Sequence, residues 1–221
     1  MSISNIKTVK RQPLNVMVYE NIKSAIVSGE IEAGTRLTET KVSEQLNVST
    51  TPVREAFRRL SSEGLVKIIP WRGAIVQEFS SKEILEVYQC REALEVMAIS
   101  LAADHIDEEG VLKLYELLKE SEQASHSRFF EINTEMHDEI ITYSRNETLA
   151  NLISQIKDVV LHNRNISSYS EERKKEIFFE HSEIVQALEK RDKEFAKAAM
   201  KKHIENGYLY ISNRLKKEES K

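Results

Sequence analysis

The sequence predicts a mainly α-helical protein in two parts: a small N-terminal unit with a short hairpin, and an all-helical C-terminal unit. All three prolines and four of the six glycines fall before residue 80, so the rest of the chain is nearly free of helix breakers. Apolar residues in that remainder recur at helical spacing. Residues 1–79 carry 11 Lys and Arg against 8 Asp and Glu, whereas residues 80–221 carry 21 against 28. The first part is therefore basic and the second acidic, as expected of two units with different partners.

A helix-turn-helix is predicted between residues 38 and 64. Its first helix covers 38–47, where Val42 and Leu46 are four residues apart on one face. Its second helix follows Ser49, a common N-cap type, and has Pro52 in the first turn, where a missing N–H costs little. The apolar residues of the second helix share one stripe, and they are Val53, Ala56, Phe57 and Leu60. Three arginines (Arg54, Arg58 and Arg59) lie off this stripe, which is typical of a helix that enters a DNA major groove.

A strand pair after the second helix supports this interpretation. Residues 65–69 and 74–77 read as short strands, and residues 70–73 between them form a basic turn. Such a hairpin is the wing of a winged helix, and Arg72 and Gly73 at its tip can approach a phosphate or the minor groove. The alternative is a small helical domain with surface arginines, but turn, caps, arginines and hairpin coincide here.

Residues 14–76 closely resemble the N-terminal domain of GntR-type bacterial transcription regulators. The matching pieces are residues 18–22, 25–29, 33–37, 51–56, 59–60, 63–66, 70, 72–73 and 76. The resemblance implies a double-stranded DNA operator with an inverted repeat, read by a homodimer. By position it implies that Arg54 reads a base, Thr51 contacts a phosphate or base, and Gly73 contacts DNA at the wing tip. The full set of expected DNA-binding residues is Thr40, Ser49, Thr50, Thr51, Arg54, Arg58, Arg72 and Gly73.

Two positions depart from the family pattern. Thr50 stands where the family usually has arginine, and Thr40 aligns with an arginine that contacts DNA in the FadR regulator. Arginine to guanine is the commonest specific base contact, worth roughly 1–3 kcal/mol. The operator sequence of this protein should therefore differ from those of its relatives.

The C-terminal unit reads as helices throughout. Ser80 and Glu83 have the spacing of a capping box that opens a helix to about residue 104. Further helices are expected at about 107–124, 128–143, 146–167, 171–190 and 192–214. An all-α bundle builds ligand or metal sites in its interior. We take residues 1–79 as the winged helix-turn-helix domain and 80–221 as the domain that, by resemblance to regulators of this type, binds the effector and forms the dimer.

Histidines on three of these helices are the next informative feature. Asn133 and His137 are four residues apart and project from one helix face, while His181 and His203 lie on the last two helices. Neutral imidazoles that converge can bind Zn, Ni, Fe or Cu. Spacing alone leaves a plainer alternative open, namely scattered surface or core histidines.

Residues 80–212 resemble the FCD domain, the ligand-binding domain of the FadR subfamily. Its metal-binding members carry an Asp four residues before a His, then two further His on the last two long helices. His137, His181 and His203 match all three histidine positions, whereas Asn133 occupies the usual Asp position. The resemblance implies a divalent transition metal such as Zn or Ni held by these four side chains. Because an asparagine oxygen brings no negative charge, we expect weaker metal binding or an altered preference.

The same resemblance implies a small organic acid as effector. Arg91 matches a cavity-facing arginine of the first FCD helix, and Arg164 is a second candidate. A guanidinium can bind a carboxylate with two hydrogen bonds, which lysine cannot do equally well. The expected mechanism is allosteric, with a repressor released from DNA by its ligand as the default.

Two other functions stay open at this stage. The metal itself can be the effector or a purely structural element, and three His around an open metal can also activate water in an enzyme. In an enzyme, Glu139 or Glu180 would have to act as the base, but neither lies in a recognised catalytic motif.

Targeting signals are not predicted. No segment approaches the about 20 apolar residues of a membrane span, and the basic N-terminus has no apolar stretch behind it. The single cysteine, Cys90, cannot form an internal disulfide. A cytoplasmic location is the expectation.

Overall fold

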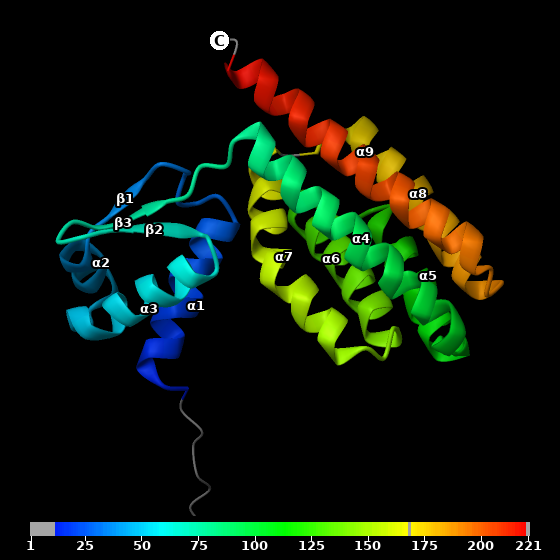
Figure 1. Cartoon of the computed structure of the whole chain (residues 1–221), viewed down its shortest axis with the longest axis horizontal. Coiled ribbons are helices and arrows are strands. Elements are labelled where there is room, and N and C mark those ends of the chain that lie inside the picture. The colour runs from blue at the N-terminus through cyan, green and yellow to red at the C-terminus, as the bar shows by residue number, and fades with distance from the viewer. Residues whose placement is uncertain (1–11, 168, 220–221) are drawn as a thin grey trace, which may run out of the picture. The chain divides into compact units, whose positions relative to one another are not determined.

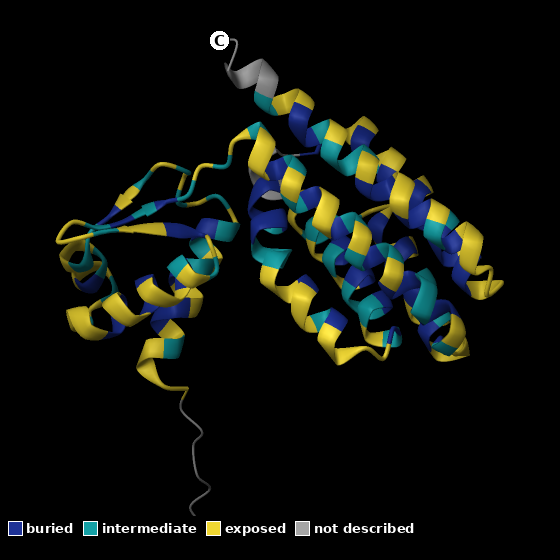
Figure 2. Ribbon diagram, viewed as in Figure 1, coloured by how far each residue is buried: buried dark blue, intermediate teal, exposed yellow. Residues whose placement is uncertain are grey.

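The computed structural model describes residues 12–167 and 169–219, and for residues 164–167 and 216–219 it describes the backbone alone. The chain divides into two compact units, one ending at Glu78 and the other beginning at Phe79 (Figure 1). Each unit encloses an apolar core of its own, and buried residues line the inner faces of its helices (Figure 2). Each core can therefore position the polar side chains of its own unit.

The N-terminal unit consists, within the described residues, of three helices and a three-stranded sheet. Its elements are α1 (Leu14–Val27), β1 (Arg36–Leu37), α2 (Glu39–Leu46), α3 (Thr50–Ser62), β2 (Val66–Ile69) and β3 (Gly73–Val76). The strands are antiparallel in the order β1-β3-β2, so that Ala74 of β3 lies between Leu37 and Ile68. The predicted hairpin is confirmed. Strand β1 was not predicted, because two residues leave no alternating pattern to detect.

The helix-turn-helix is confirmed as α2 and α3. The Thr38 hydroxyl caps α2 by accepting from the Lys41 N–H at 3.3 Å, and Asn47 ends α2 in the left-handed conformation (φ 53°). Ser49 is the N-cap residue of α3, although its hydroxyl makes no capping hydrogen bond. The predicted apolar stripe of α3 is buried in the core of the unit, which leaves the opposite face of α3 exposed.

The C-terminal unit is an all-α bundle, as predicted. Its helices are α4 (Ser81–His105), α5 (Glu108–Ser121), α6 (His126–Tyr143), α7 (Glu147–Ser167), α8 (Glu171–Glu189) and α9 (Lys193–Glu219). The predicted capping box opens α4: the Ser80 Oγ accepts from the Glu83 N–H, and the Glu83 carboxylate accepts from the Ser80 N–H at 2.9 Å. The long helices α4 and α9 lie side by side (Figure 1).

The bundle buries a large apolar core with a polar cluster inside it. Helices α4, α5, α6, α8 and α9 contribute most of the apolar core.

Helix α9 continues past its predicted end at residue 214, since the lysine-rich sequence there holds no helix breaker. Among the residues that the structure describes, no helix combines the length and the apolar composition that crossing a bilayer requires.

The first residue of β3 must be glycine for two reasons. Gly73 has φ +90°, and a Cβ at this position would lie 2.1 Å from the carbonyl oxygen of Leu37 on the neighbouring strand. We expect Gly73→Ala to lower the melting temperature of the protein, because the clash adds to the about 1–2 kcal/mol that a left-handed backbone costs other residues.

Gly29→Ala is the matched control for this substitution. Gly29 also has positive φ (+84°), but nothing lies within 4 Å of its added Cβ. Thermal unfolding of both variants separates the clash from the backbone strain. Equal losses of stability would contradict the close approach of β1 to Gly73.

Candidate functional site

Most of the side chains expected to contact DNA are exposed on the N-terminal unit. The exposed members are Thr40, Ser49, Thr50, Thr51, Arg54, Arg58 and Arg72, whereas Gly73 is half-buried at the first residue of β3. On α3, positions 50, 54 and 58 are four residues apart and lie above one another on the outer face. A helix of this kind presents a row of polar and cationic side chains to a major groove.

Arg54 is held in place by a carboxylate of α2. Its Nε lies 3.1 Å from both carboxylate oxygens of Glu39, and its Nη2 donates to Oε2 at 2.7 Å. The hydrogen bond from Arg54 lowers the pKa of Glu39, and the pKa of Arg54 is raised in turn. The pair fixes the direction of the guanidinium between the two helices. The sequence reasoning missed Glu39, because its partner lies 15 residues away across the turn.

Two further residues of this unit change the sequence-based interpretation. Arg59 lies over the Tyr19 ring at 3.6 Å and pairs with Glu63, so this arginine, although exposed, is held against α1 and not in the row of positions 50, 54 and 58. Trp71 at the wing tip is fully exposed and adopts φ +64°, a conformation rare for a bulky residue. Because Trp71 is the only tryptophan in the chain and lies in the predicted basic turn, the sequence alone could have marked it as a candidate contact residue.

The C-terminal unit brings three histidines together. His137 of α6, His181 of α8 and His203 of α9 are all buried, and they offer ligand atoms that lie within 4.8 Å of one another. The Nε2 atoms of His137 and His203 are 3.2 Å apart. Two imidazoles bound to one metal at 2.0–2.1 Å would place their nitrogens about 3.0–3.4 Å apart. The cluster is therefore consistent with the metal site of an FCD domain.

Asn133 lies one helical turn before His137 and is also buried. Its Oδ1 has no hydrogen-bond partner among the described residues. A buried amide oxygen without a partner costs free energy, and a cation can satisfy it. The donor set of three imidazoles and one amide oxygen fits a divalent transition metal.

Two buried glutamates flank the histidines. The Glu95 carboxylate lies 2.5 Å from His137 Nδ1, and the Glu180 carboxylate lies 2.7 Å from His203 Nδ1. Burial raises the pKa of Glu180, but hydrogen bonds from His203 and Arg173 outweigh it and hold the pKa at about 2. Burial likewise raises the pKa of Glu95, and the charge of Arg91 with the contact from His137 brings it well below the usual range. Both side chains are therefore anions.

Arg91 reaches the cluster from α4. Its Nε donates to Glu95 at 2.6 Å, and its Nη2 lies 3.2 Å from His137 Nε2. With His137 it lines a small cavity between α4, α6 and α7 that has a volume of about 30 Å³. The other candidate, Arg164, has a side chain outside the described residues.

The remaining histidines lie outside the cluster. His126 is exposed and packs edge-on against Phe130, and His162 is buried near Phe79. Neither belongs to the three histidines whose ligand atoms lie together.

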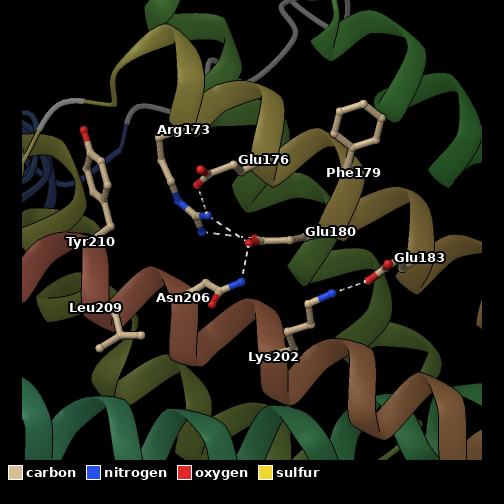
Figure 3. A pocket seen from close by; sticks show the side chains of 9 residues that line it. All are labelled: Arg173, Glu176, Phe179, Glu180, Glu183, Lys202, Asn206, Leu209 and Tyr210. Carbon is tan, nitrogen blue, oxygen red and sulfur yellow. Dashed lines mark hydrogen bonds and ion pairs between the residues drawn. The ribbon is translucent and has the colours of Figure 1, made fainter.

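A second, wider groove runs between α8 and α9 (Figure 3). Its volume is about 490 Å³, and Phe179 and Leu209 stand at its edges. In its floor Arg173 and Asn206 both donate to Glu180, at 2.8 and 2.7 Å (Figure 3). The groove and the histidine cluster thus share the carboxylate of Glu180.

The buried cluster should make the metal-free protein sensitive to acid. Burial lowers the pKa of His203 to about 4, despite its hydrogen bond to Glu180. An unfolded histidine titrates near 6.5, so the unfolded state binds more protons than the folded state between these values. We expect the free energy of unfolding to fall by up to about 1.4 kcal/mol per pH unit as pH drops through this window.

Urea unfolding in the presence of a chelator, at pH 7 and pH 5, measures this effect. His203→Gln should remove this contribution and flatten the pH dependence. Equal stability of the unmodified protein at the two pH values would contradict the buried neutral histidine.

Comparison with known proteins finds a matching family for each of the two units. Residues 14–76 match the family described as "Bacterial regulatory proteins, gntR family", and residues 86–206 match the FCD domain. The chain is 28% identical to the HTH-type transcriptional regulator YdhC of Bacillus subtilis over 96% of each chain. It is 30% identical to the transcriptional repressor RspR of Escherichia coli, over 88% of this chain and 87% of RspR.

A solved structure shares the fold of the whole chain. The structure of Escherichia coli McbR/YncC superposes with a TM-score of 0.80 at 23% identity, and the match covers 93% of this chain and 100% of McbR. These relatives are transcriptional regulators and not enzymes, which removes the metal-dependent enzyme from the alternatives. The protein therefore belongs to the GntR family of bacterial DNA-binding transcriptional regulators, with the C-terminal FCD domain of the FadR subfamily.

Proposed function

We propose that this regulator is a cytoplasmic repressor whose operator binding is controlled by a small carboxylate bound at a divalent transition metal. Asn133, His137, His181 and His203 hold the metal, and Arg91 binds the effector carboxylate, with Arg164 as a second candidate. The observation that carries the proposal is the buried histidine cluster, where the Asn133 oxygen faces no partner among the described residues. When bound, the metal supplies a Lewis-acidic position that an oxygen of the effector can occupy.

The surroundings of Arg91 support an anion as ligand. Its guanidinium is buried, lines the cavity beside His137 and donates one hydrogen bond, from Nε, to Glu95. Its Nη2 lies 3.2 Å from the neutral His137 Nε2, and a carboxylate would offer the guanidinium an anionic acceptor, which makes a stronger hydrogen bond than a neutral one.

The size of the cavity favours a second candidate function. Its 30 Å³ hold about one water molecule. An organic acid needs more room, so α4, α6 and α7 must separate before it enters. A regulator whose effector is the metal alone needs no such movement. This alternative predicts that metal removal changes DNA affinity while carboxylates do not.

On the DNA side, we propose a homodimer that places two α3 helices on an inverted repeat. Closed two-fold symmetry is the commonest arrangement of homo-oligomers, and it matches symmetric operators. The effector changes operator affinity only if it binds the two states of the dimer unequally. RspR, which is 30% identical to this chain over 198 aligned residues, is a repressor, and this supports the same sign of regulation here.

Arg54→Ala should remove most sequence-specific DNA binding. The side chain is exposed on α3, and a bidentate arginine–base contact is worth roughly 1–3 kcal/mol. Affinity is measured on an operator selected in vitro from random DNA with the full-length protein. Arg128→Ala removes the same charge from α6 and is the control. If Arg54→Ala kept its preference for the selected operator, the docking of α3 would be wrong.

Trp71→Ala should weaken operator binding by about fivefold or more, since truncation of an interfacial tryptophan commonly costs over 1 kcal/mol. An exposed indole in a left-handed backbone gains nothing from the core, which points to a contact outside the chain. Because Trp71 is the only tryptophan, its emission reports the wing tip directly when DNA is added. Leu112→Ala on α5 is the control. Unchanged emission and affinity would exclude a DNA contact.

Metal analysis tests the sensor site. Protein purified without chelator should contain about one divalent metal per chain, and His181→Ala should lose it because one of few ligands is removed. His126→Ala, which changes an exposed histidine outside the cluster, should keep it. Operator binding of the loaded protein is then measured with a panel of small carboxylates. Equal metal content in all three proteins would contradict the site.

A further inference from the structure

Two matched chains of hydrogen bonds hold the histidines from opposite sides of the cluster. On one side Arg91 donates to Glu95 at 2.6 Å, and Glu95 lies 2.5 Å from His137 Nδ1. On the other side Arg173 donates to Glu180 at 2.8 and 3.0 Å, and Glu180 lies 2.7 Å from His203 Nδ1. All six side chains are buried. We call these two chains of hydrogen bonds the Arg–Glu–His relays. The first joins α4 to α6, and the second joins α8 to α9.

The relays determine which nitrogen of each imidazole carries the proton. A carboxylate only accepts hydrogen bonds, so the Nδ1 atom that faces it must be the donor. A neutral imidazole then has its lone pair on Nε2. In both rings this atom points into the cluster, where the two Nε2 atoms of His137 and His203 are 3.2 Å apart. The lone pair of His137 accepts from Arg91 Nη2 at 3.2 Å, and a metal cation that bound both imidazoles would take the place of this donor.

Each glutamate is braced so that it can stay buried as an anion. Arg173 binds both oxygens of Glu180, and Asn206 donates to Oε1 at 2.7 Å (Figure 3). A buried carboxylate without such partners would be costly. The brace therefore keeps a negative charge one imidazole away from the metal site.

We infer that Glu95 and Glu180 are positioning residues that orient His137 and His203 for metal and supply the negative charge that Asn133 does not. Carboxylates bonded to the outer nitrogen of a metal-binding histidine fix its tautomer and raise its basicity, and their loss typically weakens metal binding about 10- to 100-fold. This inference rests on the metal site of the proposed function. It adds two residues of different helices that sequence spacing alone did not connect to the metal.

The test compares Glu180→Gln with Glu176→Gln in the full-length protein. Glu176 accepts from the same guanidinium at 2.9 Å but makes no hydrogen bond to a histidine among the described residues. Its substitution therefore removes the same charge and a bond to the same arginine. We expect the Zn²⁺ affinity, measured by competition with a chromophoric chelator, to fall about 10- to 100-fold in Glu180→Gln and to change less than about twofold in Glu176→Gln. Glu95→Gln should resemble Glu180→Gln, with Glu92→Gln on α4 as its control.

A second measurement needs no variant and no metal. Long-range ¹H–¹⁵N spectra of the metal-free protein report the tautomer of each histidine, and His137 and His203 should both be Nδ1–H. Nε2–H forms at these two residues, or equal Zn²⁺ affinities of Glu180→Gln and Glu176→Gln, would overturn the inference. If the unmodified protein binds no Zn²⁺ while both residues are Nδ1–H, the relays stand and the metal site of the proposed function fails.

Discussion

The C-terminal unit depends on one constraint: three imidazoles, two carboxylates and two guanidiniums are enclosed in an apolar bundle and must satisfy one another. Isolated buried charges cost several kcal/mol each, so the bundle tolerates them only as a connected network. The network links α4 to α6 through Glu95 and His137, and α8 to α9 through Glu180 and His203. The same contacts therefore hold these helices together and set the geometry of the histidine cluster.

The two units place their polar residues in opposite ways. In the N-terminal unit the apolar stripe of α3 is buried and the polar face is exposed, which suits a long, charged, hydrated partner such as DNA. In the C-terminal unit the functional polar residues point inward, which suits a small ligand that must lose its water on binding. In the proposed function, a ligand held by α4, α6, α8 and α9 would change the packing of these helices, and a change of this kind can alter how the proposed dimer presents its DNA-binding helices.

Local signals explain what the sequence predicted well. The capping residues Ser80 and Glu83 and the apolar stripe of α3 act within a few residues, so both helices were predicted close to their observed bounds. The three histidines were identified because the FCD resemblance carries their positions. What sequence reasoning missed are pairings between distant segments: Glu95 meets His137 across 42 residues, and Glu39 meets Arg54 across the helix turn. No periodicity encodes such contacts, since they depend on how whole helices pack.

X-ray absorption at the edge of the metal that co-purifies with the protein tests the central claim most directly. The account predicts three imidazole ligands at about 2.0–2.1 Å, with oxygen in the remaining positions. Multiple scattering from the imidazole rings distinguishes them from other light ligands. A metal with one imidazole or none, surrounded by oxygen alone, would mean that the ion is held elsewhere on this acidic unit and would contradict the account.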